Sequence, residues 1–175
     1  MVINSHLHGG IHGNAGAVAS LPLQVASPPA AAVDATAPEQ LISMASLWDL
    51  EQRFLSVGLE PSAAYDERAT DGAYAEHTAA WIERAALGLA QCVVSGTAFL
   101  DLDAVVIDGS FSRTMLSRLI AQTTAALERY NWEGLWRTRL IAGDIGSDAR
   151  ALGGALLPLH ENFAPDHDLF LKALA

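Results

Sequence analysis

The chain has 175 residues, the size of one domain or of one half of a two-lobed protein, and 51% of them are hydrophobic, enough for a buried core. The formal net charge of −10 argues against direct contact with nucleic-acid phosphates, and the single cysteine, Cys92, excludes an internal disulfide and a cysteine-rich zinc site. No apolar run reaches the roughly 18–20 residues of a membrane span and no secretory signal is recognisable, so we expect a soluble, cytoplasmic protein without a membrane partner.

The N-terminal part, residues 1–23, is predicted to be a short strand followed by a glycine-rich loop. Residues 1–8 alternate roughly between apolar and polar side chains, and "GGIHGNAG" at residues 9–16 ends the pattern. Prolines and alanines dominate residues 24–38, which we expect to form an extended link. The first strand has no other strand close by in sequence, so we expect its edge to pair with a segment encoded elsewhere or upstream.

Two helices are predicted over residues 39–94. The first begins near Glu39 and ends before Gly58, because apolar residues recur every three or four positions between them. The second runs from about Asp71 to Val94, and a turn is expected after it. The inner faces are expected to hold Leu41, Met44, Leu47, Trp48, Leu50, Phe54 and Leu55 in the first helix, and Tyr74, Trp81, Ile82, Ala85, Leu89 and Cys92 in the second.

Residues 104–164 are predicted to be a β-α-β-α unit. The apolar run in "AVVIDGS" is typical of a strand buried on both faces, and Ser112 can cap the helix that follows. "RTRLIAGDIG" predicts a second strand, and Ser147 or Asp148 can begin the last helix, which Pro158 would kink or end unless the helix restarts there. Strands joined through a helix are most easily parallel, so the predicted fold class is α/β, with a sheet that is incomplete at its N-terminal end.

The glycine-rich loop allows two interpretations. Its glycines permit positive φ angles and let backbone N–H groups approach a phosphate or a sugar hydroxyl, but plain turn chemistry accounts for the same residues. The nearby His6, His8 and His12 could gather a metal ion, but no carboxylate or cysteine lies near them in sequence to complete the shell. Polar histidines on a strand and a turn are the simpler interpretation.

The ends of the two predicted strands carry a second glycine group, Gly109, Gly143 and Gly146. In open α/β sheets this edge is where nucleotides bind, although a close-packed turn needs the same residues. Three aspartates occur in the same stretches: Asp108, Asp144 and Asp148. They could serve acid–base chemistry or bind Mg²⁺, but an aspartate at a turn is more typical of a cap. No G-x-S-x-G elbow is present, and we predict no catalytic residue.

Three motifs taken in order resemble the C-terminal part of the ROK family of repressors, open-reading-frame proteins and sugar kinases. They are "GGIHGNAGAVASLPL", "VVIDGSFS" and "GDIGSDARALGGALLPL", and the resemblance extends from about Val2 to Phe163. It implies the C-terminal lobe of the actin-like, ribonuclease-H-like fold, with a sugar in the cleft and ATP against this lobe. The D-x-G-x-T turn, the catalytic aspartate and the Asn-Asp pair that grips the sugar belong to the family's N-terminal lobe, outside this chain.

The chain departs from the kinases of that family at the sugar and zinc positions. The kinases follow "GNAG" with a glutamate and then a histidine, where this sequence has Ala17 and Ser20. The C-x-C-G-x-x-G-C zinc loop has no counterpart in residues 24–46, and the position of the later sugar-binding glutamate falls near Trp48, one turn before Glu51. We therefore expect no zinc and no other cofactor, with ATP and Mg²⁺ bound only if the protein is a kinase.

The resemblance implies the sugar-sensing lobe of a ROK-type transcriptional regulator, non-catalytic by itself and homo-oligomeric. DNA would be contacted only through a winged-helix domain outside this chain. The expected sugar contacts are Gly13, Asn14, Gly16, Ser20 and Glu51, and the expected nucleotide side is Gly109, Gly143 and Gly146. The alternatives are the C-terminal lobe of a divergent, zinc-free ROK sugar kinase that phosphorylates a hexose or a derivative, and a remnant that serves only packing or oligomerisation.

Overall fold

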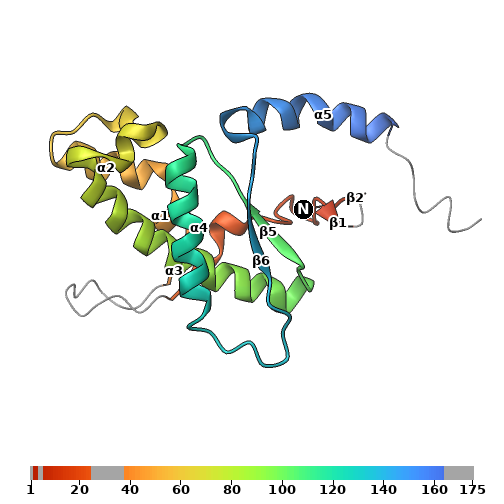
Figure 1. Cartoon of the computed structure of the whole chain (residues 1–175). Helices are drawn as coiled ribbons and strands as arrows, with labels where there is room; N and C mark the ends of the chain where they lie inside the picture. Colours follow the sequence, from red (N-terminus) through yellow and green to blue (C-terminus); the bar gives the residue numbers. More distant parts are fainter. Residues whose placement is uncertain (1, 4–5, 25–37, 164–175) are drawn as a thin grey trace, which may run out of the picture.

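The computed structural model shows a mixed α/β chain that is mostly helical, with small sheets (Figure 1). The structure describes residues 2–3, 6–24 and 38–163. The described strands form three two-stranded sheets, and the helices α1 to α4 gather into one body. No helix in these ranges combines the length and the apolar character that crossing a bilayer requires.

The N-terminal segment forms its own small pairings. The single strand expected over residues 1–8 is wrong: β1 (Val2–Ile3) and β2 (His6–Leu7) are separate and pair antiparallel with each other. Alternation in sequence cannot distinguish one strand from two short ones that pair locally. After the glycine loop and the 3₁₀ turn η1 (Val18–Ser20), β3 (Pro22–Leu23) pairs antiparallel with β4 (Glu39–Gln40). The Pro/Ala-rich link falls almost wholly outside the described residues.

The first predicted helix is two helices, α1 (Leu41–Ala45) and α2 (Leu47–Ser56). Ser46 separates them because its backbone is extended and its hydroxyl accepts a hydrogen bond from the Asp49 N–H at 3.3 Å, which caps α2. The break rotates α2 relative to the continuous helix that the spacing implied, so Trp48 and Leu55 are exposed rather than inward. Gly58, with φ of +75°, follows the end of α2 as predicted.

Three short 3₁₀ turns, η2 (Pro61–Tyr65), η3 (Glu67–Thr70) and η4 (Gly72–Tyr74), lead into the long helix α3 (Ala75–Leu100). The predicted helix is correct in position but begins four residues later and ends six residues later than expected. The turn predicted after Val94 is therefore wrong. Thr97 lies inside the helix, where its hydroxyl donates to the Val93 carbonyl oxygen at 2.8 Å and so has a partner although it is buried. The helix ends at Leu100, and Asp101 follows with φ of 51°.

The C-terminal half follows the predicted β-α-β-α order, with β5 (Ala104–Ile107), α4 (Arg113–Leu127), β6 (Arg139–Ala142), η5 (Gly146–Asp148) and α5 (Ala149–Phe163). The predicted parallel pairing is confirmed, with Val106 opposite Ile141. Ser112 caps α4, because its hydroxyl accepts a hydrogen bond from the Met115 N–H at 3.1 Å. Helix α5 continues through Pro158. Ser147 and Asp148 lie within η5, which leads directly into α5.

One expectation for this half is wrong: β5 is not buried on both faces. Val105 and Ile107 pack inward, but Val106 on the opposite face is 64% exposed. Ile141, its neighbour on β6, is 41% exposed. A continuous apolar run is typical of a strand buried on both faces, and only the three-dimensional structure shows that none of the described elements covers this face.

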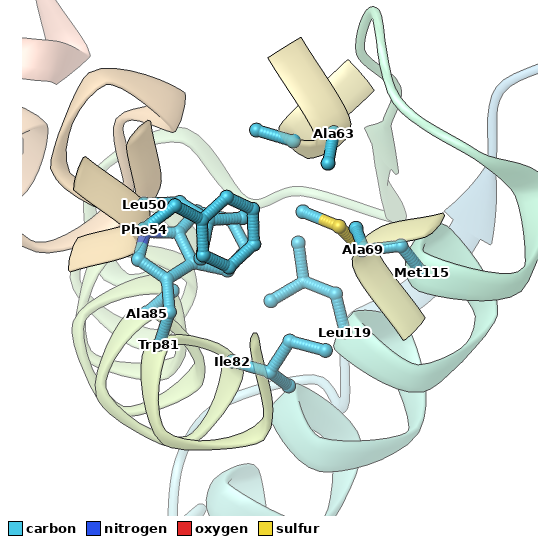
Figure 2. Close-up of a cluster of buried hydrophobic side chains, with 10 residues drawn as sticks. Leu50, Phe54, Ala63, Ala69, Trp81, Ile82, Ala85, Met115 and Leu119 are labelled. Carbon is cyan, nitrogen blue, oxygen red and sulfur yellow. The ribbon is translucent and has the colours of Figure 1, made fainter. Parts of the chain in front are cut away.

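The main core lies between α2, α3 and α4, and Figure 2 shows its side chains converging from these helices and from the 3₁₀ turns. Trp81 is at its centre, 1% exposed, and its indole N–H donates to the Ser46 carbonyl oxygen at 3.1 Å. Phe54 packs edge-to-face on Tyr74 with 4.9 Å between ring centroids. Two smaller clusters lie further along α3, one around Leu23 and one around Trp132.

Candidate ligand site at the ends of the parallel strands

The loops that follow β5 and β6 lie side by side, because parallel strands end at the same edge of their sheet. The Gly143 N–H donates to the Ile107 carbonyl oxygen at 2.8 Å and carries the strand pairing into the loops. The structure therefore brings together the predicted nucleotide-side group Gly109, Gly143 and Gly146.

Asp108 holds the two loops together. Its Oδ1 accepts a hydrogen bond from the Gly109 N–H at 2.9 Å. Its Oδ2 accepts from the N–H groups of Gly146 at 2.8 Å and Ile145 at 3.1 Å, both in the other loop. These bonds, the one from Gly146 first, lower the pKa of Asp108 to about 2 against the opposing effect of desolvation. Asp108 thus caps the turn, the simpler of its two predicted roles.

Arg113, in the first turn of α4, completes the arrangement. Its guanidinium donates to the Gly143 carbonyl oxygen at 2.7 Å and to Asp108 Oδ1 at 3.1 Å. A cation is unfavourable at a helix N-terminus, and the Asp108 carboxylate compensates for it. We call these two side chains and the loop groups that they bind the Asp108–Arg113 clasp.

The glycines of the clasp are required by close packing. A Cβ on Gly143 would lie 2.5 Å from the Asp108 Cβ, and a Cβ on Gly146 would lie 2.7 Å from an Arg113 nitrogen. Gly146 also has φ of +67°, which a residue with a side chain rarely adopts. A tight loop-to-loop turn thus accounts for both residues.

An open pocket of about 520 Å³ adjoins the clasp, and we call it the strand-end pocket. Arg113, with its side chain 50% exposed, faces it together with the acidic Glu67 and Asp144. Its lining residues are Tyr65, Glu67, Ser110, Phe111, Ser112, Arg113, Asp144, Ile145, Gly146 and Ser147. Arg113, Tyr65 and Phe111 are not among the predicted site residues, although an arginine in the first turn of a helix and close to an aspartate is a usable signal.

Glu51, predicted as a sugar contact, lies on α2. Its carboxylate acts on the Tyr65 hydroxyl and raises the pKa of Tyr65. Tyr65 in turn lines the strand-end pocket. The structure therefore associates Glu51 with the predicted nucleotide side.

The other predicted sugar contacts, Gly13, Asn14, Gly16 and Ser20, share one exposed loop and do not line the strand-end pocket. Backbone bonds shape the loop: the Ala17 N–H donates to the Asn14 carbonyl oxygen at 3.0 Å. Gly13 and Gly16 have φ angles of +74° and +83°, in agreement with their predicted turn role.

Hydrophobic contacts attach the glycine loop to the helical body. Leu23, just after the loop, is 2% exposed and packs with Leu41 and Met44. A Cβ on Gly88 of α3 would meet all three side chains at 3.2–3.3 Å, so the missing side chain lets this segment approach the helix closely.

His6, His8 and His12 were considered as ligands of a metal ion, with polar histidines as the simpler interpretation. Across residues 2–3, 6–24 and 38–163, no group of three or more His, Cys, Asp or Glu side chains is placed to hold a metal ion. The side chain of His6 lies outside the description.

Fold and site together define a mostly helical α/β protein with a clasped pair of parallel strands and an adjoining pocket. The chain matches no protein-family model, and no curated protein is significantly similar to it.

Proposed function

We propose that the chain is the C-terminal, sugar-sensing lobe of a ROK-type transcriptional regulator and belongs to the actin-like fold. In this role it binds a sugar or a sugar derivative without turning it over. DNA is contacted by a domain outside the chain, which agrees with the net charge of −10 on these residues.

The hydrogen bonds of Asp108 bear on the role of the strand ends. Three backbone N–H groups and Arg113 occupy its carboxylate, so its part at the strand ends is to hold the loops. A general base must be free to accept a proton from a reactant, and its pKa works best near the operating pH. A pKa of about 2 fits a carboxylate that holds the loops together rather than one that takes up a proton.

The observation that carries the proposal is the exposed glycine loop, which supplies groups suited to sugar hydroxyls. Asn14 and Ser20 are exposed, and an amide and a hydroxyl both donate and accept hydrogen bonds. Ala17, which stands where the ROK kinases have a glutamate, offers no such group. Neutral contacts contribute about 0.5–1.5 kcal/mol each and charged ones about 1.5–3 kcal/mol, so the loop favours a weaker, sensing interaction.

The two candidate regions rest on the same helix. Leu23 and Met44, which anchor the glycine loop, contact α3 at Gly88, and Trp81 of α3 belongs to the core behind the strand-end pocket. A sugar that favours one arrangement of the loop segment on α3 would shift the population of that arrangement.

Calorimetric titration of the full chain with hexoses, N-acetylhexosamines and their phosphates tests the proposal. We expect one sugar class to bind and Asn14→Ala to weaken that binding about tenfold, the loss of roughly one polar contact. Asn131→Ala, another exposed asparagine in a turn, is the matched control and leaves the affinity unchanged. The absence of binding by every sugar, or an equal effect of both substitutions, would contradict the proposal.

The kinase alternative is favoured by one observation, the position of Gly109 beside the strand-end pocket. The same calorimeter can titrate the chain with ATP and Mg²⁺. Binding that Arg113→Ala abolishes would favour the kinase lobe, whereas the sensing proposal expects no heat of binding. The two acidic residues of the pocket, Glu67 and Asp144, repel a polyphosphate and favour the latter result.

A further inference from the structure

Burial in the core does not hold helix α5 in place. Every side chain of α5 that the structure describes, at residues 149–160, 162 and 163, is exposed, and none of them belongs to the three hydrophobic clusters. Helices α1 to α4, in contrast, each contribute buried side chains. Figure 1 shows α5 extending from the end of β6 away from these helices. The segment that joins α5 to β6 therefore has a large part in setting the direction of α5.

This joining segment consists of residues 143–148 only, and the Asp108–Arg113 clasp bonds it. The Gly143 carbonyl oxygen accepts from the Arg113 guanidinium at 2.7 Å. The N–H groups of Ile145 and Gly146 donate to Asp108 Oδ2 at 3.1 and 2.8 Å. Gly146, which is buried and has φ of +67°, then turns the chain into η5 and α5. The clasp thus fixes the path of the chain just before α5 begins.

The clasp can open without disturbing the core. Its bonds are made by two charged side chains that solvent reaches, since the side chain of Arg113 is 50% and that of Asp108 18% exposed. Neither residue belongs to a hydrophobic cluster. Opening the clasp therefore exchanges hydrogen bonds between the loops for hydrogen bonds to water and leaves α2, α3 and α4 packed.

We propose that the Asp108–Arg113 clasp is a conformational lock on α5. When the clasp is closed, it fixes the direction of α5; when it is open, α5 reorients about residues 143–148 while the helical body stays folded. The strand-end pocket lies at this lock, because Arg113, Ile145 and Gly146 line the pocket and also form the clasp. A molecule held in the pocket would therefore contact the residues that set the direction of α5. The inference goes beyond the proposed function and does not depend on the binding of a sugar.

Pulsed electron paramagnetic resonance of the full chain tests the lock, because it measures the distance between two nitroxide labels. In a Cys92→Ala background, the labels are attached to Ala121→Cys on α4 and Ala155→Cys on α5, both at exposed positions. We expect this labelled parent chain to give one narrow distance distribution, because the closed clasp holds α5 in one direction.

Two substitutions open the clasp by different means. Arg113→Ala removes the bond to the Gly143 carbonyl oxygen, and Gly143→Ala places a Cβ 2.5 Å from the Asp108 Cβ. A turn of α5 by about 30° moves Ala155, which lies about 9 Å from the start of the helix, by about 5 Å. We therefore expect both substitutions to shift or broaden the distance distribution by about 5 Å.

Trp81→Phe in the same labelled chain is the control. It removes a bond to Ser46 and loosens the main core, but it removes no bond of the clasp, so the distance distribution should equal that of the parent chain. An equal change in Trp81→Phe would trace the movement of α5 to a general loss of stability and would overturn the proposal. A broad distribution in the parent chain, or distributions of Arg113→Ala and Gly143→Ala that match it, would overturn the proposal as well.

Discussion

A single methyl group at Gly143 should open the Asp108–Arg113 clasp. In Gly143→Ala, the new Cβ would lie 2.5 Å from the Cβ and 2.8 Å from Oδ2 of Asp108, whereas ordinary contacts are 3.4–4 Å. The Asp108 side chain must therefore move by about 1 Å, which separates its Oδ2 from the Gly146 N–H now 2.8 Å away. Overpacking of this kind costs about 1–3 kcal/mol.

Urea unfolding followed by far-ultraviolet circular dichroism measures this cost. With an m value of about 2 kcal/mol/M, a loss of about 2 kcal/mol lowers the midpoint by about 1 M. Gly9→Ala is the control, because no atom lies within 4 Å of its Cβ position and its φ is not left-handed, so its stability should change by less than about 0.5 kcal/mol. Equal midpoints for the two variants would refute the close approach of the loops.

Three further substitutions probe the same architecture. Asp108→Asn replaces Oδ2, which accepts from two N–H groups, with a donor and lowers the urea midpoint at pH 7. Since the folded pKa of about 2 lies below the ordinary 3.8, the wild type loses this stabilisation as the pH falls from about 4 to 2, and its midpoint should decline more steeply across that range than that of the variant. Ser112→Ala removes the cap of α4 and should cost about 1 kcal/mol in urea unfolding, whereas an unchanged midpoint would argue against the bond to Met115. Trp81→Phe removes the bond to Ser46 and part of a buried ring, for a loss of about 2 kcal/mol by the same assay; a loss below 0.5 kcal/mol would contradict its central position.

Local signals predicted the C-terminal half well. Ser112, which precedes an amphipathic segment, correctly predicted where α4 begins. Two short apolar strands separated by that helix correctly predicted parallel pairing. The break between α1 and α2 at Ser46 was not predicted. A serine within a periodic apolar pattern is compatible with the polar face of one continuous helix, whereas here its hydroxyl caps a new helix. The extension of α3 beyond Val94 was missed because Gly96 suggested a turn, although a glycine within a packed helix is tolerated.

The candidate site was predicted in its positions but not in its contacts. Gly143 and Gly146 do lie at the strand ends, but the reason is the close approach of Asp108, just after β5, and of Arg113, at the start of α4. These contacts span 30 to 38 residues of the chain. Glu51 was grouped with the glycine loop because of the resemblance to the ROK kinases, whereas its effect on the pKa of Tyr65 relates it to a residue that lines the strand-end pocket. Neither relation can be read from spacing, because both depend on how α2, η2 and α4 pack.

Helix α3, about 39 Å long, passes through all three hydrophobic clusters of the described chain. Trp81 belongs to the main core, Leu89 packs against the cluster of the N-terminal segment, and Val93 belongs to the cluster around Trp132. If the part of α3 that belongs to one cluster unfolds, the packing of the other two clusters is weakened as well. The glycine loop, the strand-end pocket and the sheet therefore share α3 as a common support, and we expect a substitution that destabilises this helix to lower the protection of backbone amides from hydrogen exchange in all three regions.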